Sequence, residues 1–379
     1  MCYNLGVMYQ VYIFLYFILN IYPAFRTYQW LHLYVDSLSA IAFGIIFALF
    51  PIASVVTFYS HKVPIRVKKV VDWVGGIFML VFLFSFVFWL FYDIGRLIVK
   101  HTDLDPILFE KYGGFAVVIF SAVIIILGYI NYAKLHVTNY TISFDHKIEG
   151  GLRAVLISDV HLGAVNSERR FKDTVSLINK QKADVVFISG DLFNNNFFAI
   201  IDPDEVRKQI NTINAKYGVF YCLGNHDAGK TYPDMERFIN SCNITFLKDE
   251  FYDVDGKFSV LGRIDPMPMG GFGDNKRKEL DVIESNRESD LPVIVLEHNP
   301  GTIGEYDGKY DLILCGHTHH GQMFPANLVT KMLFKVDYGY YRESPEKPSV
   351  IVSSGSGIWA MPFRMASKCE IVTIDIDKN

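Results

Sequence analysis

The first third of the chain contains four long runs without charged side chains, and these runs constrain the fold more than any other feature. The runs are Cys2–Phe25, Leu38–Tyr59, Trp73–Tyr92 and Gly113–Tyr132. Each reaches the roughly 20 residues that an α-helix needs to cross a hydrocarbon core of about 30 Å. We therefore predict a transmembrane region over residues 1–135, with four helical spans at about 2–25, 38–59, 73–92 and 113–132.

Two other interpretations of these runs are weaker. A cleaved signal peptide would carry Lys or Arg before the first run, and none is present. A buried core of a soluble helical protein is disfavoured because four charge-free runs of this length are typical of membrane spans. The runs contain no Asp, Glu, Lys, Arg or His, which argues against an ion pathway and therefore against a transporter or channel.

Positive charges are unevenly distributed between the two sides of such a membrane region. Seven Lys and Arg residues flank the side that would hold both chain ends: Lys62, Arg66, Lys68, Lys69, Lys134, Lys147 and Arg153. Four flank the other side: Arg26, Arg96, Lys100 and Lys111. Because Lys and Arg are enriched on the cytoplasmic side of membrane proteins, we expect the C-terminal domain to lie in the cytoplasm.

Bulk composition excludes some classes of partner and cofactor. The net charge is −4 and the isoelectric point is about 6.3, so no nucleic acid partner is expected. The five cysteines are widely spaced and form no CxxC pair, so neither a disulfide framework nor a thiolate zinc site is indicated.

From residue 136 to residue 379 the sequence changes to short apolar runs that alternate with amphipathic segments. Eight runs read as buried strands: Ala154–Ile157, Val185–Ile188, Val219–Leu223, Phe258–Leu261, Val293–Leu296, Leu312–Cys315, Val350–Val352 and Ile371–Ile376. Helical patterns at Arg169–Lys182 and Asp204–Lys216 fall between the early strands. This alternation predicts a layered α/β domain.

Five of these predicted strands are followed directly by residues that bind metals. The five segments are Ser158–His161, Gly190–Asp191, Gly224–Asp227, Glu297–Pro300 and Gly316–His319. Residues that follow buried strands project into the crevice beyond the strand ends, and donors at positions i and i+2 of an extended chain share one side. Carboxylate, imidazole and amide donors without thiolate suit Mn, Fe, Co or Zn ions. Each motif alone is weak, but five in order indicate a metal centre.

These motifs, read as DxH, GD, GNHD, a single His and GHxH, resemble the calcineurin-like metallophosphoesterase superfamily over about residues 150 to 376. Two further stretches, Gly316–Tyr341 and Ser353–Arg364, resemble its membrane-associated branch, which includes bacterial YkuE-type proteins. The resemblance implies a β-sandwich flanked by helices, here preceded by the four-helix transmembrane region. It also leads us to expect a multi-pass protein of the bacterial inner membrane.

The resemblance also implies roles for individual residues and a cofactor of two divalent ions, Mn, Fe or Zn. Asp159, His161 and His319 would bind the first ion, Asp191 would bridge both, and Asn225, His298 and His317 would bind the second. His226 would be the catalytic histidine, and Asp227 would orient it. His320 and Arg364 are candidates for substrate contact, because they lie beside the motifs.

The expected function is hydrolysis of a phosphodiester, phosphomonoester or pyrophosphate by a metal-activated hydroxide. Anchoring to the membrane makes a lipid-linked substrate an attractive partner. The main alternative is a non-catalytic metal-binding scaffold on the same fold. A nuclease is the weakest alternative, given the acidic isoelectric point and the lack of a basic stretch.

Overall fold

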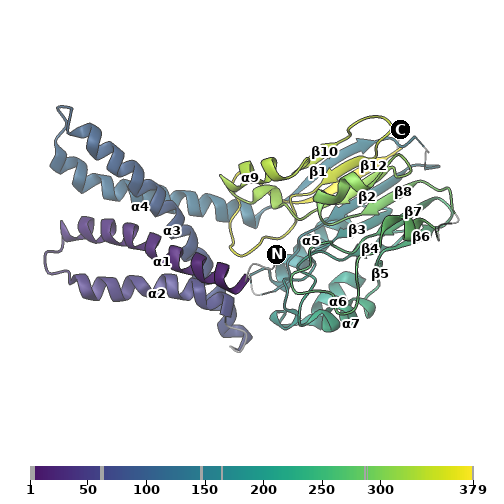
Figure 1. Cartoon of the computed structure of the whole chain (residues 1–379), viewed down its shortest axis with the longest axis horizontal. Coiled ribbons are helices and arrows are strands. Elements are labelled where there is room, and N and C mark those ends of the chain that lie inside the picture. Colours follow the sequence, from purple (N-terminus) through teal and green to yellow (C-terminus); the bar gives the residue numbers. More distant parts are fainter. Residues whose placement is uncertain are drawn as a thin grey trace. The chain divides into compact units, whose positions relative to one another are not determined.

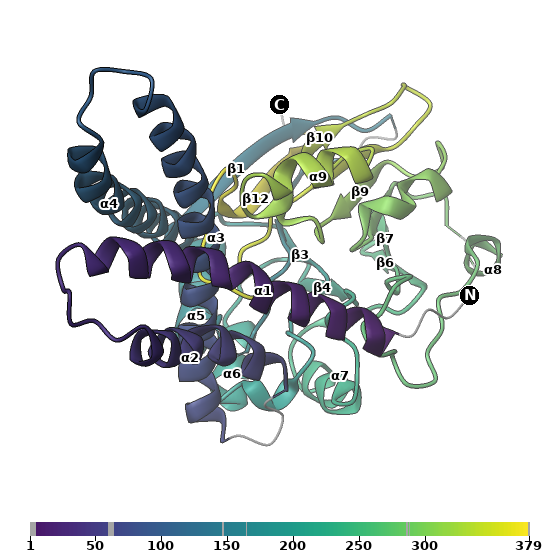
Figure 2. The ribbon, with the colours of Figure 1, turned by 60° about the vertical axis from the view of Figure 1, so that its left-hand side comes forward.

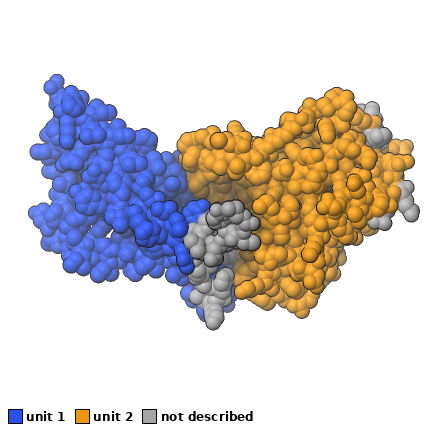
Figure 3. All heavy atoms as spheres, viewed as in Figure 1, with its two compact units in different colours: residues 1–129, 360–362 blue, residues 130–359, 363–379 orange. Residues whose placement is uncertain are grey.

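The computed structural model describes residues 5–59, 64–145, 148–163, 165–285, 287 and 289–377. The chain divides into two compact units (Figure 3). The first comprises residues 1–129 and the short segment 360–362, and the second comprises residues 130–359 and 363–379. Each unit is described separately below.

Long helices build the first unit. They are α1 (Leu5–His32), α2 (Ala40–Tyr59), α3 (Ile65–Val99) and α4 (Pro106–Ala133), the last of which continues into the second unit. Among the described residues, α3 and α4 are long and apolar enough to cross a membrane, and α2 contains a shorter apolar stretch, Ala40–Val56. The expectation of four spans is thus supported for two helices and not for the other two.

Two glycines allow close packing of α4 in this unit. A Cβ atom at Gly113 would lie 2.5 Å from the ring of Tyr92, and one at Gly114 would lie 2.2 Å from the ring of Trp30. Small residues at such crossings are typical of helix packing in membranes, where close backbone approach replaces the hydrophobic driving force.

Two six-stranded sheets form the centre of the second unit (Figures 1 and 2). The first has the order β1 (Leu135–Ile142), β12 (Cys369–Ile376), β2 (Leu152–Ile157), β3 (Val185–Ser189), β4 (Val219–Cys222) and β5 (Thr245–Phe246). The second has the order β10 (Gly339–Tyr341), β11 (Ser349–Val352), β9 (Leu312–Cys315), β8 (Val293–Leu296), β7 (Phe258–Gly262) and β6 (Glu250–Val254). Strands β2 to β5 are mutually parallel, as are β7, β8, β9 and β11.

Helices cover the outer faces of both sheets. The first sheet carries α5 (Glu168–Lys180), α6 (Pro203–Asn211) and α7 (Tyr232–Asn240), and the second carries α8 (Leu280–Glu284) and the 3-10 helix η2 (Pro300–Glu305). The remaining helices are η1 (Phe197–Ala199), η3 (His319–Gly321) and α9 (Ala326–Leu333).

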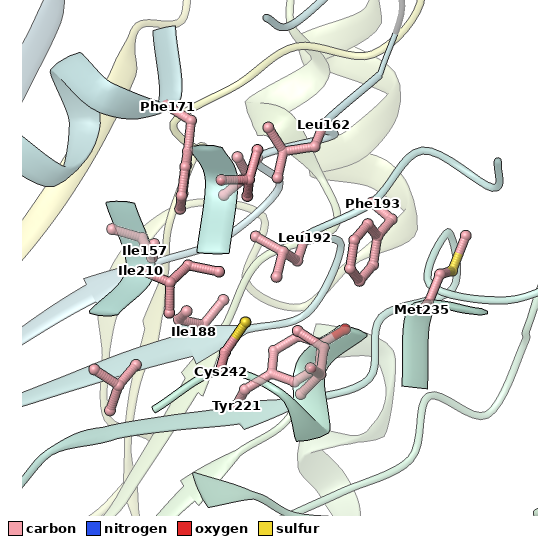
Figure 4. Packing of buried hydrophobic residues seen from close by; sticks show 14 of the residues in the cluster. Ile157, Leu162, Phe171, Ile188, Leu192, Phe193, Ile210, Tyr221, Met235 and Cys242 are labelled. Atoms are coloured by element: carbon pink, nitrogen blue, oxygen red, sulfur yellow. The ribbon is translucent and has the colours of Figure 1, made fainter. Parts of the chain in front are cut away.

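Side chains alternate between two cores along each central strand. In β2, Val155 and Ile157 face the helices while Ala154 and Leu156 face the other sheet. Figure 4 shows Ile157, Ile188 and Tyr221 of neighbouring strands among side chains of the covering helices. This period of two is what a strand buried on both faces requires.

All eight predicted strands are present, and the two predicted helical patterns correspond to α5 and α6. The sequence interpretation missed β1, β5, β6 and β10. Strand β1 reads LHVTNYTI and is mostly half-buried, so it lacks the continuous apolar run that marks the central strands.

Candidate metal centre

The five predicted motifs meet because the strands before them are parallel. Their loops follow β2, β3 and β4 in one sheet and β8 and β9 in the other. Backbone hydrogen bonds join neighbouring loops: the Asp159 N–H donates to Gly190 at 3.1 Å, and the Gly316 N–H donates to His298 at 3.0 Å. The donor residues of the five loops therefore converge at the carboxyl ends of both sheets.

The backbone at this convergence is strained. Five of the predicted ligands adopt positive φ angles: Asp159 (49°), His161 (49°), Asp191 (53°), His317 (73°) and His319 (49°). For residues other than glycine this left-handed region costs about 1–2 kcal/mol each. Such strain persists where the surrounding structure enforces it, and it is common at functional sites.

The glycines of the motifs serve two different purposes. Gly190 has a φ of +75°, a backbone conformation that glycine adopts without strain. Gly224 and Gly316 are needed for close approach. A Cβ atom at Gly224 would lie 2.3 Å from Asp191 Oδ1, and one at Gly316 would lie 2.4 Å from Asp159 Oδ2.

One group of donors consists of Asp159, His161 and His319, whose ligand atoms all lie within 4.8 Å of one another. The Nε2 atoms of His161 and His319 face each other at 3.0 Å. His319 Nε2 lies 3.5 Å from Asp159 Oδ1. These three side chains are almost fully buried, so their nitrogen and oxygen atoms point at each other and away from solvent.

A second group of donors consists of Asn225, His298 and His317. Asn225 Oδ1 lies 3.2 Å from His298 Nε2 and 3.0 Å from His317 Nδ1. The other ring nitrogen of His298 bonds to the carbonyl of Ser189 at 2.8 Å, which directs Nε2 into the site.

Asp191 lies between the two groups. Its Oδ2 atom is 3.2 Å from His298 Nε2 and 3.6 Å from His161 Nε2. Its Oδ1 atom accepts a hydrogen bond from the His226 N–H at 2.7 Å. One carboxylate oxygen therefore faces donors of both groups.

The protonation states of the site suit metal binding. Burial lowers the pKa of His161 to about 3 and that of His317 to about 4, and burial with the nearby Arg364 lowers the pKa of His319 well below its usual value. These rings are therefore neutral at pH 7 and offer lone pairs. Burial opposes ionisation of Asp191, but His298 beside it dominates and lowers the pKa of this carboxyl.

The same mutual interaction acts on His298. Burial opposes its charge, yet Asp191 raises the pKa of His298 well above its usual value. The neutral imidazoles of His161, His317 and His319, an amide oxygen and ionised carboxylates are a donor set that fits divalent ions of the Mn, Fe and Zn type, and His298 releases a proton when it binds an ion.

His226 lies beside His161 and Asp191, and the residue next to its ring is not Asp227, which was predicted to orient it. Asn195 Oδ1 lies within hydrogen-bond distance of His226 Nδ1, in place of Asp227. The Asp227 carboxylate instead accepts backbone N–H groups of Asp191, Phe193 and Gly224 at 2.7–2.8 Å. Asp227 therefore holds the loops after β3 and β4 together. The sequence signal for Asn195 was its place in the Asn194–Asn196 run after the GD motif.

Arg364, a candidate for substrate contact, is buried beside the loop that carries His319. The side chain is 0% exposed, and its two terminal nitrogens bond to the carbonyls of His319, Ser354 and Gly357 and to Ser367 Oγ. One of them also lies 3.1 Å from His319 Nδ1. A guanidinium so enclosed positions the His319 loop, and contact with a substrate stays a prediction.

His320 is directed toward a neighbouring loop. Its Nδ1 lies 3.1 Å from Asp337 Oδ2, and its ring lies against Tyr338 with 4.7 Å between ring centres. The ring is partly exposed, so contact with a substrate stays a prediction.

Two facing sheets, flanking helices and candidate metal-binding loops at the strand ends form an α/β fold of the metallophosphoesterase type. The family of calcineurin-like phosphoesterases matches residues 152–321. Residues 152–321 are therefore similar to calcineurin-like phosphoesterases, and the site offers residues that could hold divalent metal ions.

Individual relatives agree with this class. The chain is 29% identical over 227 residues to an uncharacterized metallophosphoesterase of Helicobacter pylori, covering 59% of this chain and 60% of the relative. It is 28% identical over 321 residues to a Danio rerio protein named transmembrane protein with metallophosphoesterase domain, covering 79% and 71%. It is 24% identical to YkuE of Bacillus subtilis, covering 66% and 89%. The chain thus spans about three fifths of the length of the Helicobacter pylori relative.

Proposed function

We propose that this protein is a membrane-anchored phosphohydrolase that cleaves a phosphoester with two divalent ions. The observation that carries the proposal is the position of Asp191 Oδ2, which faces His161 of one donor group and His298 of the other. A shared carboxylate between two groups of donors is the arrangement that a pair of closely spaced ions requires.

In this proposal each donor group holds one ion. Asp159, His161 and His319 would hold the first, Asn225, His298 and His317 would hold the second, and Asp191 lies between the two groups. The bound ions would polarise the phosphoryl oxygens and make water a stronger nucleophile. The strained loops hold the donors in place before an ion or a substrate arrives, which lowers the cost of reorganisation.

His226 acts on the substrate in this proposal. Asn195 Oδ1 accepts from Nδ1 and fixes the orientation of the ring, which leaves Nε2 facing the substrate, and the ring donates a proton to the leaving oxygen when both of its nitrogens are protonated. Asp227 supports this placement indirectly, since it holds the backbone of the loops that carry His226 and Asp191.

The first experiment measures hydrolysis of bis-p-nitrophenyl phosphate and p-nitrophenyl phosphate by the detergent-purified chain with Mn²⁺, then with a chelator. Asp191→Ala should abolish turnover and lose metal, and His226→Ala should lower turnover about 100-fold or more while keeping both ions. His136→Ala, a histidine of β1 outside the site, is the matched control. Metal binding without turnover of any phosphoester would favour the scaffold alternative.

We propose in addition that the substrate is lipid-linked and that residues 1–135 anchor the catalytic domain, residues 136–379, to the cytoplasmic face of a membrane. The support is partly the apolar length of α3 and α4 and the name of the Danio rerio relative. Only Lys134 separates α4 from β1, so a membrane-spanning α4 would hold the domain at the bilayer surface.

Helix α9 also favours a lipid-linked substrate. It follows the GHxH loop and buries none of its residues, while Met332 is 85% exposed and Leu333 is 72% exposed. Phe334, just after α9, lies against the ring of His317 with 5.8 Å between ring centres. The exposed apolar side chains of α9 could bind the apolar chain of a lipid while the attached phosphate lies at the predicted metal ligand His317.

A further inference from the structure

Asp265 is a buried acidic residue that none of the five motifs includes. It lies three residues beyond β7, the strand next to β8, and it is 1% exposed. Its Oδ1 atom accepts a hydrogen bond from the Met267 N–H at 2.7 Å. Its Oδ2 atom is buried and has no hydrogen-bond partner among the described residues.

The Asp265 carboxylate faces the second donor group. One of its oxygens lies within 4.8 Å of a ring nitrogen of His298 and a ring nitrogen of His317, and these nitrogens are equally close to each other. A parallel bridge between Ile264 and Leu223 holds the segment before Asp265 beside the loop that carries Asn225. Asp265 is therefore fixed next to three residues proposed to bind the second ion.

Two other buried carboxylates, which lie outside the donor groups, have arginine partners. Asp249 pairs with Arg263 at 3.1 Å, and Glu297 pairs with Arg277 at 2.7 Å. The described ion pairs give Asp265 no such partner. A buried carboxylate oxygen without a hydrogen-bond partner is costly, and the group nearby that could carry positive charge is His298, itself a proposed ligand, so a cation beside Oδ2 would offset this cost.

We infer that Asp265 Oδ2 is an additional ligand of the second metal ion, together with Asn225, His298, His317 and the bridging Asp191. The inference rests on the proposed two-metal function and adds a residue to it. A second carboxylate gives this position a harder, more negative donor set, which favours oxygen-seeking ions such as Mn²⁺ over softer ones.

The test is a calorimetric titration of Mn²⁺ into the metal-free, full-length protein in detergent. Asp265→Asn keeps the size of the side chain and the acceptor for Met267 but removes the charge. We expect it to raise the Kd of one of the two ions about 10-fold to 100-fold. Asp265→Glu, which keeps a carboxylate, should restore part of the affinity. Asp274→Asn, an exposed residue nearby in the sequence, is the matched control and should change nothing.

Two results would overturn the inference in different ways. If the wild-type protein binds two ions and Asp265→Asn binds both equally well, Asp265 is not a ligand of the second ion, and the proposed function is unaffected. Wild type that binds no ion removes both proposals together. A crystal structure of the Mn²⁺-loaded wild type gives the direct readout whether or not the variant folds: an Oδ2-to-metal distance of about 2.0–2.2 Å supports ligation, and a distance beyond about 3 Å rules it out.

Discussion

At the scale of single residues, the contact between Asn195 and His226 gives a test of ring orientation. Asn195→Ala removes the acceptor beside Nδ1, so the ring can rotate away from its working position. We expect turnover of p-nitrophenyl esters to fall about 10-fold to 100-fold while both ions stay bound. Asn194→Ala, at the preceding position, is the matched control. Equal rates for the two variants would show that Asn195 does not act through His226.

Asp159 gives a prediction for the pH dependence of metal affinity. Burial raises the pKa of Asp159 to about 6, so in the metal-free protein this carboxyl holds a proton below that pH. An incoming ion must displace the proton, and affinity should weaken about tenfold for each unit that the pH falls below about 6. Titration of Mn²⁺ at about pH 5 and about pH 7.5 measures this, and equal affinities would contradict it.

At the scale of secondary-structure elements, the junction of β4 with its loop tolerates no side chain at Gly224. The Cβ atom of Gly224→Ala would meet the backbone N and the Oδ1 atom of Asp191 at 2.3 Å. We expect a loss of about 1–3 kcal/mol in the free energy of unfolding and a weaker ion site, because Asp191 must move. Gly304→Ala in η2, where a new Cβ meets nothing within 4 Å, is the control. Denaturant unfolding and metal analysis of both variants measure the difference.

The apolar surface of α9 gives a second prediction at this scale. Replacing Met332 and Leu333 together by Asn removes exposed apolar groups without touching the core. We compare turnover of a phospholipid ester in vesicles with turnover of p-nitrophenyl phosphate, and we expect the ratio of the two rates to fall at least tenfold. The reason is that the binding free energy of the lipid loses about 25 cal/mol for each Å² of apolar contact removed. Val282→Asn, 54% exposed on α8, is the control. An unchanged ratio would rule out α9 as the lipid contact.

At the scale of the whole molecule, the sequence predicted the buried centre better than the edges. Strands such as β8 and β9, buried on both faces, are continuous apolar runs and are visible without a structure. Edge strand β1 pairs with β12, which lies more than 200 residues later, and its own mixed pattern carries little signal.

The site residues show the same difference between what the sequence predicts and what depends on three-dimensional packing. The motif residues follow strands, so parallel pairing alone predicts that they converge. The environment of Arg364 could not be predicted from its neighbours in the sequence. Its guanidinium bonds to the carbonyls of His319, Ser354 and Gly357, which three-dimensional packing brings together. Asp265 belongs to no motif, and its position beside His298 arises only from the pairing of β7 with β8.

The orientation of the chain in a membrane is the prediction that depends on the whole molecule. Seven Lys and Arg residues flank the side of the membrane region that holds the catalytic domain, and four flank the other side, which favours a cytoplasmic catalytic domain. A bacterial alkaline phosphatase fused to the C-terminus would then be inactive, and a fluorescent protein fused there would fold. The variant Arg66→Gln with Lys69→Gln leaves five against four, so a fraction of molecules should invert and gain phosphatase activity. Lys172→Gln with Lys180→Gln, on α5, removes as much charge without altering the membrane loops and should not invert the chain. An active phosphatase fusion on the unaltered chain would place the catalytic domain outside the cytoplasm and direct the search for substrates to that side of the membrane.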